Sequence, residues 1–119
     1  MAVVVRDFRP GDEAAFRDIN LEWIERYFAV EQKDRDVLDD PHKYILDPGG
    51  AILIAEEDGA AIGVVSLVRM DGGSVELAKM GVRPSAQGKG AGRMLVDAAI
   101  AKARAMGISR VYIETNSVL

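Results

Sequence analysis

The sequence predicts an α+β domain on a mixed sheet, in which an antiparallel meander is followed by a parallel βαβ unit. Three apolar runs in the middle of the chain are separated by the tight-turn signals Asp58-Gly59 and Asp71-Gly72-Gly73, which are typical of antiparallel hairpins. Closer to the C-terminal end, a strand pattern, a glycine-rich loop, an Ala-rich helix pattern and a second strand pattern follow in that order. This order is typical of a βαβ unit, whose two strands run parallel.

The N-terminal part predicts one strand and one long amphipathic helix. Ala2–Phe8 contains three successive valines and is closed by Pro10-Gly11, as expected of a strand. Asp12 is suited to cap the helix that follows, which should end near Val30. The apolar residues of this helix recur at helical spacing and are Phe16, Ile19, Trp23, Ile24, Tyr27 and Phe28.

Shorter elements complete the predicted fold. The polar segment Glu31–Asp47 predicts one or two short helices, and the three apolar runs predict the strands of the meander. Gly107 is suited to close the helix of the βαβ unit. The expected ranges are helices at Asp34–Leu38, Pro41–Leu46 and Arg93–Met106, and strands at Ala51–Ala55, Ala61–Val68, Val75–Val82 and Arg110–Thr115.

Composition bounds the function classes. The 119 residues are expected to form a single domain, 1–119, because 49% of them are hydrophobic and 29% are charged. The chain has no cysteine and one histidine, which excludes a disulfide scaffold, a cysteine nucleophile and a multi-histidine site, so no metal is expected. A net charge of −4 argues against nucleic-acid binding. No apolar run is long enough to span a membrane and the start lacks a secretory-signal pattern, which predicts a cytoplasmic protein.

The segment with chemical information lies between a strand ending at Val82-Arg83-Pro84 and the helix that follows. Glycines at positions 88, 90 and 92 let backbone N–H groups approach a ligand, and the helix N-terminus adds unpaired donors. With Lys89 and Arg93 beside them, these groups predict an anion site suited to phosphate or pyrophosphate. A flexible surface turn is the alternative interpretation.

Two nucleotide-binding motifs fail on this segment. A Walker A loop needs Ser or Thr after Gly88-Lys89, where the chain has Gly90. A dinucleotide-binding fingerprint needs a third glycine where the chain has Arg93 or Leu95. The run Gln87-Gly88-Lys89-Gly90-Ala91-Gly92 instead resembles the signature of the GNAT superfamily of acetyl-CoA-dependent N-acetyltransferases, which is Gln or Arg, two residues, Gly, one residue, and Gly or Ala. The order of the predicted elements is also similar to that of the family.

The resemblance implies acetyl-CoA as the cosubstrate and a place for each part of it. The backbone amides of the loop would hold its pyrophosphate, and the preceding strand would pair through its backbone with the pantetheine arm. Gly81 could mark a bulge that opens the two parallel strands, or only close packing. The cofactor-binding residues that the resemblance implies are Met80, Gly81, Val82, Gln87, Gly88, Lys89, Gly90, Ala91, Gly92 and Arg93.

The resemblance also implies a mechanism, in which a primary amine attacks the thioester directly in a ternary complex. The absence of cysteine agrees with this mechanism, because no acyl-enzyme on sulfur is available. Glu76 matches the position of a catalytic glutamate in some family members and could act as the base. It could equally face solvent or pair with Lys79. The Met80 N–H could polarise the thioester carbonyl.

The acceptor side is predicted on the first helix and the segment after it, which the family uses for its substrate. That substrate would be a small-molecule or protein amine. The candidate substrate-binding residues are Trp23, Tyr27 and Glu31, with Asn20 and Phe28 nearby. Trp23 also fits a core position at helical spacing. Glu31 and Asp34 could attract an amine, and His42 is interpreted as a surface residue.

The chain departs from the family at its C-terminal end. The family continues with another helix and two more strands, so the resemblance implies a C-terminally incomplete domain that stops after its fifth strand. The bare edge of that strand, from Val111 to Thr115, predicts either a homodimer or a longer chain of which this is the ordered part. Besides the acetyltransferase, two alternatives therefore stay open: a non-catalytic acyl-CoA-binding module and a structural dimerisation domain.

Overall fold

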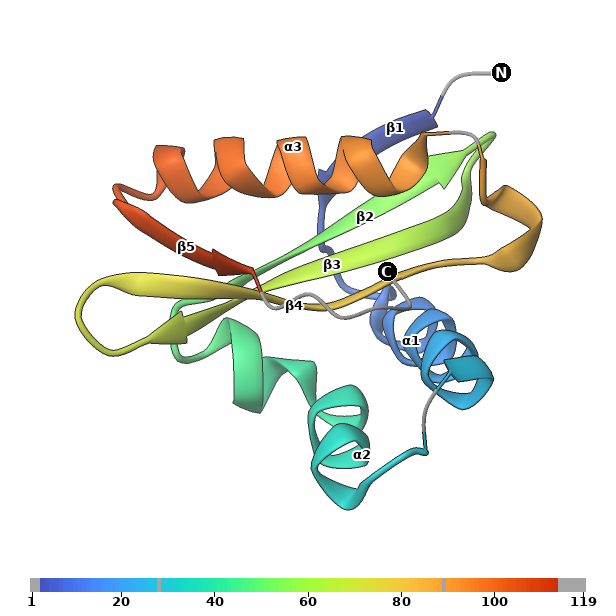
Figure 1. Ribbon diagram of the computed structural model, residues 1–119, viewed down its shortest axis with the longest axis horizontal. Helices are drawn as coiled ribbons and strands as arrows, with labels where there is room; N and C mark the ends of the chain where they lie inside the picture. The colour runs from blue at the N-terminus through green and yellow to red at the C-terminus, as the bar shows by residue number, and fades with distance from the viewer. Residues whose placement is uncertain (1–2, 28, 89, 114–119) are drawn as a thin grey trace.

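One mixed sheet of five strands separates helix α3 from helices α1 and α2 (Figure 1). The computed structural model describes residues 3–27, 29–88 and 90–113. Its elements in chain order are β1 (Val3–Asp7), α1 (Glu13–Tyr27), α2 (Gln32–Asp39), the turn η1 (His42–Leu46), β2 (Ala51–Glu57), β3 (Ala60–Met70), β4 (Ser74–Val82), the turn η2 (Pro84–Ala86), α3 (Ala91–Ala105) and β5 (Arg110–Ile113). The predicted elements also include Ala2, Phe28 and Thr115, which lie outside the described residues.

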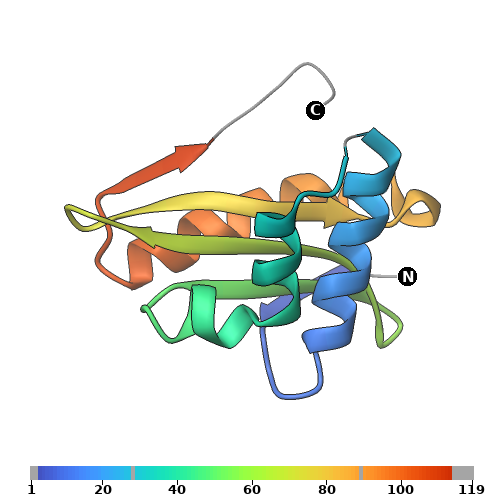
Figure 2. The same ribbon diagram turned by 90° about the horizontal axis from the view of Figure 1, so that it is seen from below.

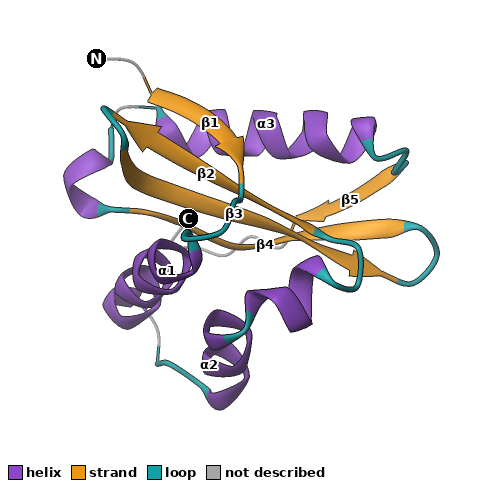
Figure 3. Ribbon diagram, turned by 180° about the vertical axis from the view of Figure 1, so that it is seen from behind, coloured by secondary structure: helices purple, strands orange, loops and turns teal. Residues whose placement is uncertain are grey.

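The sheet has the predicted topology. Its strand order is β1-β2-β3-β4-β5, in which β1 to β4 are antiparallel to their neighbours and β5 runs parallel to β4. Helix α3 lies on the opposite face of the sheet from α1 and α2 (Figures 1 and 2). Strands β1 and β5 are the two edges (Figure 3). The α+β fold with an antiparallel meander and a parallel βαβ unit is therefore confirmed.

Each face of the sheet carries its own apolar core. On one face, α3 contributes Leu95, Ala99 and Ala103, each at most 1% exposed. On the other face, α1 contributes Phe16 and Ile19, which are equally buried. Phe16 and Ile19, from the apolar stripe predicted for the first helix, therefore pack on the sheet.

The predicted end of α1 and the predicted start of α2 are both wrong. Helix α1 ends at Tyr27 rather than near Val30, and α2 begins at Gln32 rather than at Asp34. The Asp34 carboxylate accepts a hydrogen bond from the Glu31 N–H at 3.0 Å, as the third helical residue does in a capping box. This bond fixes the start of α2 two residues before the predicted one.

The segment after α2 forms the predicted short helix, as a π-helical turn at His42–Leu46. In η1, the Asp47 N–H bonds to the His42 carbonyl at 2.7 Å, five residues back. The meander strands β2 and β3 are longer than predicted, because only Asp58 and Gly59 separate them. Both turn residues have positive φ, +52° and +82°, so two residues suffice for the hairpin.

Asp12, the predicted cap of α1, takes part in a charged cluster at the start of that helix. Its carboxylate accepts hydrogen bonds from the Arg6 guanidinium at 2.8 and 3.0 Å and from the Arg9 N–H at 2.8 Å. The same guanidinium bonds to Glu56 on β2 at 3.0 Å. The hydrogen bond from Arg6 holds the pKa of Asp12 below its usual 3.8. The cluster ties strand β1 and its neighbour to the entry of α1.

Gly50 is required by the packing of η1 on the sheet. A Cβ atom at this position would lie 2.2 Å from the Leu67 carbonyl oxygen and 2.6 Å from that of Ile45, and neither backbone atom can move without shifting its element. We expect Gly50→Ala to lower the free energy of unfolding by about 3 kcal/mol, as overpacking does. Urea denaturation measures it. Gly59→Ala is the control, since only its φ of +82° opposes a side chain, and equal losses in the two variants would contradict the packing argument.

An ion pair ties η1 to the start of α1. His42 Nε2 lies 2.9 Å from Glu13 Oε2, and the imidazole packs edge-on against the Phe8 ring with centroids 5.6 Å apart. The hydrogen bond from Glu13 raises the pKa of His42 above its usual 6.5, and the reciprocal bond lowers the pKa of Glu13 below 4.5. His42 is exposed, as the sequence predicted, but it is not without a contact.

We expect Glu13→Gln to return the pKa of His42 towards 6.5. Because the folded pKa is raised, the stabilisation from charged His42 is fully present below pH 6.5 while Glu13 stays ionised, and is lost as pH rises through the folded pKa. The chain has one histidine, so NMR titration of its ring gives one curve. A wild-type midpoint at or below 6.5, or an unchanged midpoint in the variant, would contradict the contact.

Candidate functional site

The glycine-rich loop lies in the connection between the end of β4 and the start of α3. After η2, Gly88 and Gly90 adopt φ values of +86° and +80°. A Cβ atom at either position would meet nothing within 4 Å in the described structure. Glycine is therefore needed here for backbone conformation and leaves the backbone open to a ligand. Lys89, the predicted cationic neighbour, lies outside the described residues.

The N-terminus of α3 adds hydrogen-bond donors to the loop. Gly90 is the N-cap of this 15-residue helix and has no side chain to accept a hydrogen bond. The first helical hydrogen bond runs from the Met94 N–H to the Gly90 carbonyl at 3.1 Å. The amides of Ala91 to Arg93 therefore lack the intrahelical acceptors that later amides have. The Arg93 side chain is 87% exposed, 3.8 Å from Asp97. Donors, helix dipole and an exposed guanidinium together suit an anion.

Arg83 fixes the start of this loop. Its Nε donates to the Ala61 carbonyl at 3.1 Å, and its guanidinium lies 3.8 Å from the Glu22 carboxylate on α1. Its backbone N–H bonds to the Ile62 carbonyl at 2.8 Å. The end of β4 is thus held to β3 and to α1, which gives the loop after it a defined origin.

Strand β4 contains a bulge at Lys79 and Met80. The register pairs Val64 with Gly81 and Ser66 with Ala78, so these two residues of β4 stand opposite one residue of β3. Lys79 has a φ of +46°. The buried Ser66 hydroxyl donates to the Ala78 carbonyl at 2.6 Å and anchors the strand beside the bulge.

The bulge that Gly81 was predicted to mark lies directly before this residue, and Gly81 itself is closely packed, as in the alternative interpretation. A Cβ atom on Gly81 would lie 3.3 Å from the Ile19 carbonyl oxygen and 3.3 Å from the Cβ of Trp23. Helix α1 therefore approaches the backbone of β4 at this glycine. The irregular pairing is taken up by the residues just before it.

The described pairing of the two parallel strands covers the first half of β4. It runs from Ser74 with Arg110 to Leu77 with Ile113, which is the last described residue of β5. Met80 and Val82 lie in the second half of β4, beyond this pairing, on the strand that leads into the glycine-rich loop.

Glu76 lies on the paired part of β4, between Val68 of β3 and Tyr112 of β5. It is partly buried, and its neighbour Val75 packs in the core under α3, so the Glu76 side chain lies on the α1 and α2 face. The predicted alternative that it pairs with Lys79 is wrong. The Lys79 ammonium lies 2.6 Å from the Asp34 carboxylate of α2.

The predicted acceptor residues come from α1 and the start of α2. Trp23 is partly buried, with its Cβ beside Gly81. Glu31 is exposed at the N-cap of α2. Tyr27 is the last residue of α1, and its side chain is outside the described structure. The nearby Asn20 is buried and donates to the Phe16 carbonyl at 2.9 Å, which makes it part of the helix packing.

Comparison with known proteins supports the assignment that the loop suggests. The sequence model of the acetyltransferase (GNAT) family matches residues 16–118. The chain belongs to the GNAT family. It is 38% identical over 74 residues to an uncharacterized N-acetyltransferase of Mycobacterium bovis, covering 62% of this chain and 47% of the relative. It is 33% identical over 85 residues to the uncharacterized N-acetyltransferase YjgM of Escherichia coli, covering 69% and 51%. This GNAT chain therefore spans about half the length of the curated relatives it matches.

Solved structures share the fold of this GNAT chain. A GNAT-family acetyltransferase of Staphylococcus aureus superposes with a TM-score of 0.84 and 20% identity, over 96% of this chain and 73% of the other. A GNAT-family acetyltransferase of Brucella melitensis in complex with acetyl-CoA gives 0.82 and 24%, over 97% and 77%. At these identities the likeness establishes the architecture of the chain.

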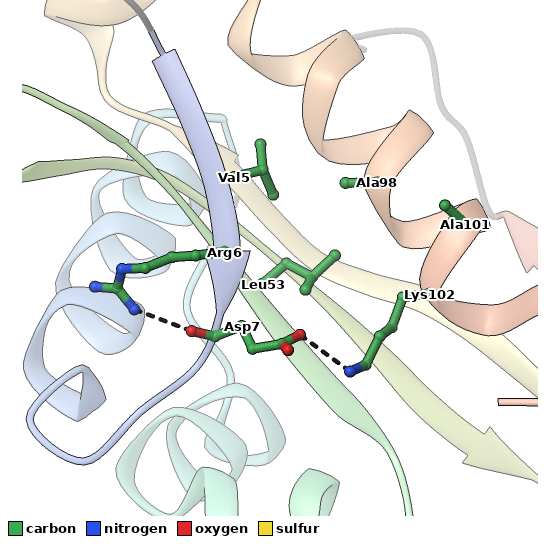
Figure 4. Close-up of a pocket in the computed structure, with 7 residues that line it drawn as sticks. All are labelled: Val5, Arg6, Asp7, Leu53, Ala98, Ala101 and Lys102. Atoms are coloured by element: carbon green, nitrogen blue, oxygen red, sulfur yellow. Dashed lines mark hydrogen bonds and ion pairs between the residues drawn. The ribbon is translucent and has the colours of Figure 1, made fainter. Parts of the chain in front are cut away.

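An open hollow of about 370 Å³ lies between β1 and α3 of the GNAT domain (Figure 4). An ion pair crosses it, with the Lys102 ammonium 3.1 Å from the Asp7 carboxylate. The lining residues are Val5, Arg6, Asp7, Leu53, Ala98, Ala101 and Lys102. None of them belongs to the glycine-rich loop or to β4, so the hollow is separate from the candidate site.

Neither a metal-binding cluster nor a membrane-spanning helix occurs among the described residues. Residues 3–27, 29–88 and 90–113 contain no group of three or more His, Asp or Glu side chains that could hold a metal ion. Within the same ranges, every helix is too short or too polar to cross a membrane.

Sequence reasoning missed two features of the site. The Ser66 hydroxyl, which bonds at the bulge, carried no signal beyond a polar residue in an apolar strand. The ion pair between Lys79 and Asp34 was not expected either, although each residue had been considered separately. The sequence signal for this contact is the position of Lys79, a lysine inside a strand pattern directly before a predicted cosubstrate contact.

Proposed function

We propose that this chain is an N-acetyltransferase that transfers the acetyl group of acetyl-CoA to a primary amine. The observation that carries the proposal is that one strand, β4, extends beyond its described pairing with β5 and leads directly into an open glycine-rich loop at a helix N-terminus. Such an arrangement suits an extended ligand that ends in a pyrophosphate. Membership of the GNAT family and the Brucella melitensis neighbour solved with acetyl-CoA support it.

The residues present fit acetyl-CoA at both ends. At the loop, open space at Gly88 and Gly90 and the free amides of α3 would receive the pyrophosphate. On β4, the backbone of Met80 and Val82 would pair with the pantetheine arm. We propose as the binding residues Met80, Gly81, Val82, Gln87, Gly88, Lys89, Gly90, Ala91, Gly92 and Arg93.

Acetyl-CoA supplies an acyl carbon activated as a thioester. The chain must therefore supply a base that makes the substrate amine neutral and a hydrogen-bond donor for the carbonyl oxygen. We assign the first task to Glu76, whose carboxylate would accept the ammonium proton directly or through a water. We assign the second to the Met80 N–H. We propose that the neutral amine attacks the acyl carbon directly in a ternary complex, in agreement with the absence of cysteine from the chain. The new N–C bond replaces the C–S bond, and the departing CoA thiolate takes up the proton that the bound amine nitrogen loses.

The acceptor is proposed to enter from the α1 and α2 side, where Trp23, Tyr27 and Glu31 come from adjacent segments. A small-molecule amine and a protein amine both fit this description. Homodimerisation through β5 is a further proposal, because Tyr112 and Ile113 are each 48% exposed on an edge strand. The cytoplasmic location stays a prediction from the sequence.

Two assays test the proposed function. Isothermal titration with acetyl-CoA measures binding, and thiol release from acetyl-CoA with spermidine, L-glutamate or trialanine measures transfer. We expect saturable binding and amine-dependent thiol release. Binding without release to any amine would favour the non-catalytic acyl-CoA-binding module. No binding of acetyl-CoA at all would exclude both the acetyltransferase and the acyl-CoA-binding module, and would leave the structural dimerisation domain.

A further inference from the structure

An ion pair joins the bulge of β4 to helix α2, on the acceptor side of the site. The Lys79 Nζ lies 2.6 Å from the Asp34 Oδ1, and the two side chains are 23% and 14% exposed. The second oxygen of Asp34 accepts the Glu31 N–H at 3.0 Å. A continuous chain of polar contacts therefore runs from the strand that would carry the thioester to Glu31, a residue of the proposed acceptor side.

Lys79 occupies a backbone conformation that favours glycine. Its φ of +46° places it in the left-handed region, where a Cβ atom is unfavourable. A glycine would be the less strained residue at this bulge. The lysine directs its ammonium towards α2, whereas the next residue, Met80, packs against the core under α3. The strained residue is thus the one that makes the contact with α2.

Fold stability does not account for this arrangement. A partly exposed ion pair stabilises a fold only weakly, by an amount similar to the cost of a left-handed lysine. Burial raises the pKa of Asp34, but the bonds from the Lys79 ammonium and the Glu31 N–H outweigh it, and the pKa stays below 3.8. Asp34 therefore remains ionised at neutral pH, and its contact with the Lys79 ammonium joins α2 to the bulge.

We propose that Lys79 is a positioning residue for the acceptor: its ion pair with Asp34 holds α2 against the bulge of β4 and so forms one wall of the amine site. This inference rests on the proposed acetyltransferase function. Lys79 acts through α2 and not on the reacting atoms, so its loss should weaken capture of the amine more than it slows transfer.

Two substitutions of Lys79 separate positioning from stability. Lys79→Met keeps a long side chain and loses the charge, and Lys79→Gly loses the charge while relieving the strain at φ +46°. Lys102→Met is the matched control, because it breaks the ion pair with Asp7 at 3.1 Å in the hollow between β1 and α3 (Figure 4). Lys79→Arg keeps the charge and should keep the wild-type KM for the amine.

The measurements are the KM and kcat for whichever of spermidine, L-glutamate and trialanine gives the fastest thiol release, the acetyl-CoA Kd and the thermal midpoint. We expect the amine KM to rise about tenfold in both Lys79→Met and Lys79→Gly, with kcat changed by less than about threefold. The acetyl-CoA Kd should stay within about twofold. The thermal midpoint of Lys79→Gly should be no lower than that of the wild type. If Lys79 only stabilised the fold, this variant would therefore keep the wild-type KM for the amine.

Each outcome decides the proposal. An unchanged amine KM in both Lys79 variants of an active enzyme overturns the positioning role and leaves the acetyltransferase intact. A wild type that fails to bind acetyl-CoA overturns the proposed function and this inference together. If the wild type binds acetyl-CoA but acetylates none of the three amines, hydrogen exchange decides. Faster exchange of the α2 amides in Lys79→Met than in Lys102→Met supports the anchoring, and equal exchange overturns it.

Discussion

Gly90→Asp is expected to abolish acetyl-CoA binding while the domain stays folded. The aspartate carboxylate would lie at the N-terminus of α3, among the amides proposed for the pyrophosphate, and would repel the ligand. Asp is among the residues that best tolerate positive φ, so the domain should stay folded despite the strain at φ +80°. Isothermal titration should show a Kd raised by about 100-fold or more, which corresponds to about 2.7 kcal/mol.

Gly72→Asp is the matched control for this variant. Gly72 has a φ of +81°, close to the +80° of Gly90, and a side chain there also meets nothing within 4 Å of the described structure. It lies in the turn between β3 and β4, outside the glycine-rich loop. The control should bind acetyl-CoA like the wild type. Equal affinity in wild type and Gly90→Asp would remove the loop as the phosphate site.

Glu76→Gln should lower turnover at neutral pH by about 10²- to 10⁴-fold, the range typical of general base catalysis. The amide keeps the size of the side chain but cannot accept a proton from the ammonium. Because Glu76 lies on the paired half of β4, ahead of the bulge, the acetyl-CoA Kd should change little. Steady-state thiol release and isothermal titration measure the two quantities separately.

Asp71→Asn provides the control for loss of a carboxylate. Asp71 is exposed in the turn between β3 and β4, and its contact with Ser74 uses its backbone carbonyl, which the substitution retains. Turnover in Asp71→Asn should match the wild type. Wild-type turnover in Glu76→Gln would instead move the base role to another group or to water.

The fold could be predicted because its signals are local. Asp58-Gly59 takes the positive φ values that a two-residue hairpin needs, and Gly107 at φ +77° ends α3 as predicted. The bulge was placed at Gly81 because glycine is the usual marker. The small size of Gly81 serves the contact with α1 instead, and that contact depends on tertiary packing that the strand pattern does not encode.

The conformation of the glycine-rich loop could be predicted from the sequence, and the contacts on the proposed acceptor side could not. The loop is one continuous segment whose glycines carry their own conformational signal. The Lys79 and Asp34 pair joins residues 45 positions apart and exists only once α2 packs beside β4. The predicted pairing of Lys79 with Glu76 assumed a regular strand, and the bulge with its positive φ changes which way the lysine points.

The most direct test of the central claim is to map acetyl-CoA binding on backbone amides by NMR. The account predicts that titration with acetyl-CoA shifts the amides of Gln87 to Arg93 most strongly, followed by those of Met80 and Val82 in the second half of β4, beyond its described pairing with β5. Amides beside the hollow between β1 and α3, such as that of Ala98, should shift least. Largest shifts at the hollow, or no saturable shift at the glycine-rich loop, would contradict the assignment of the site.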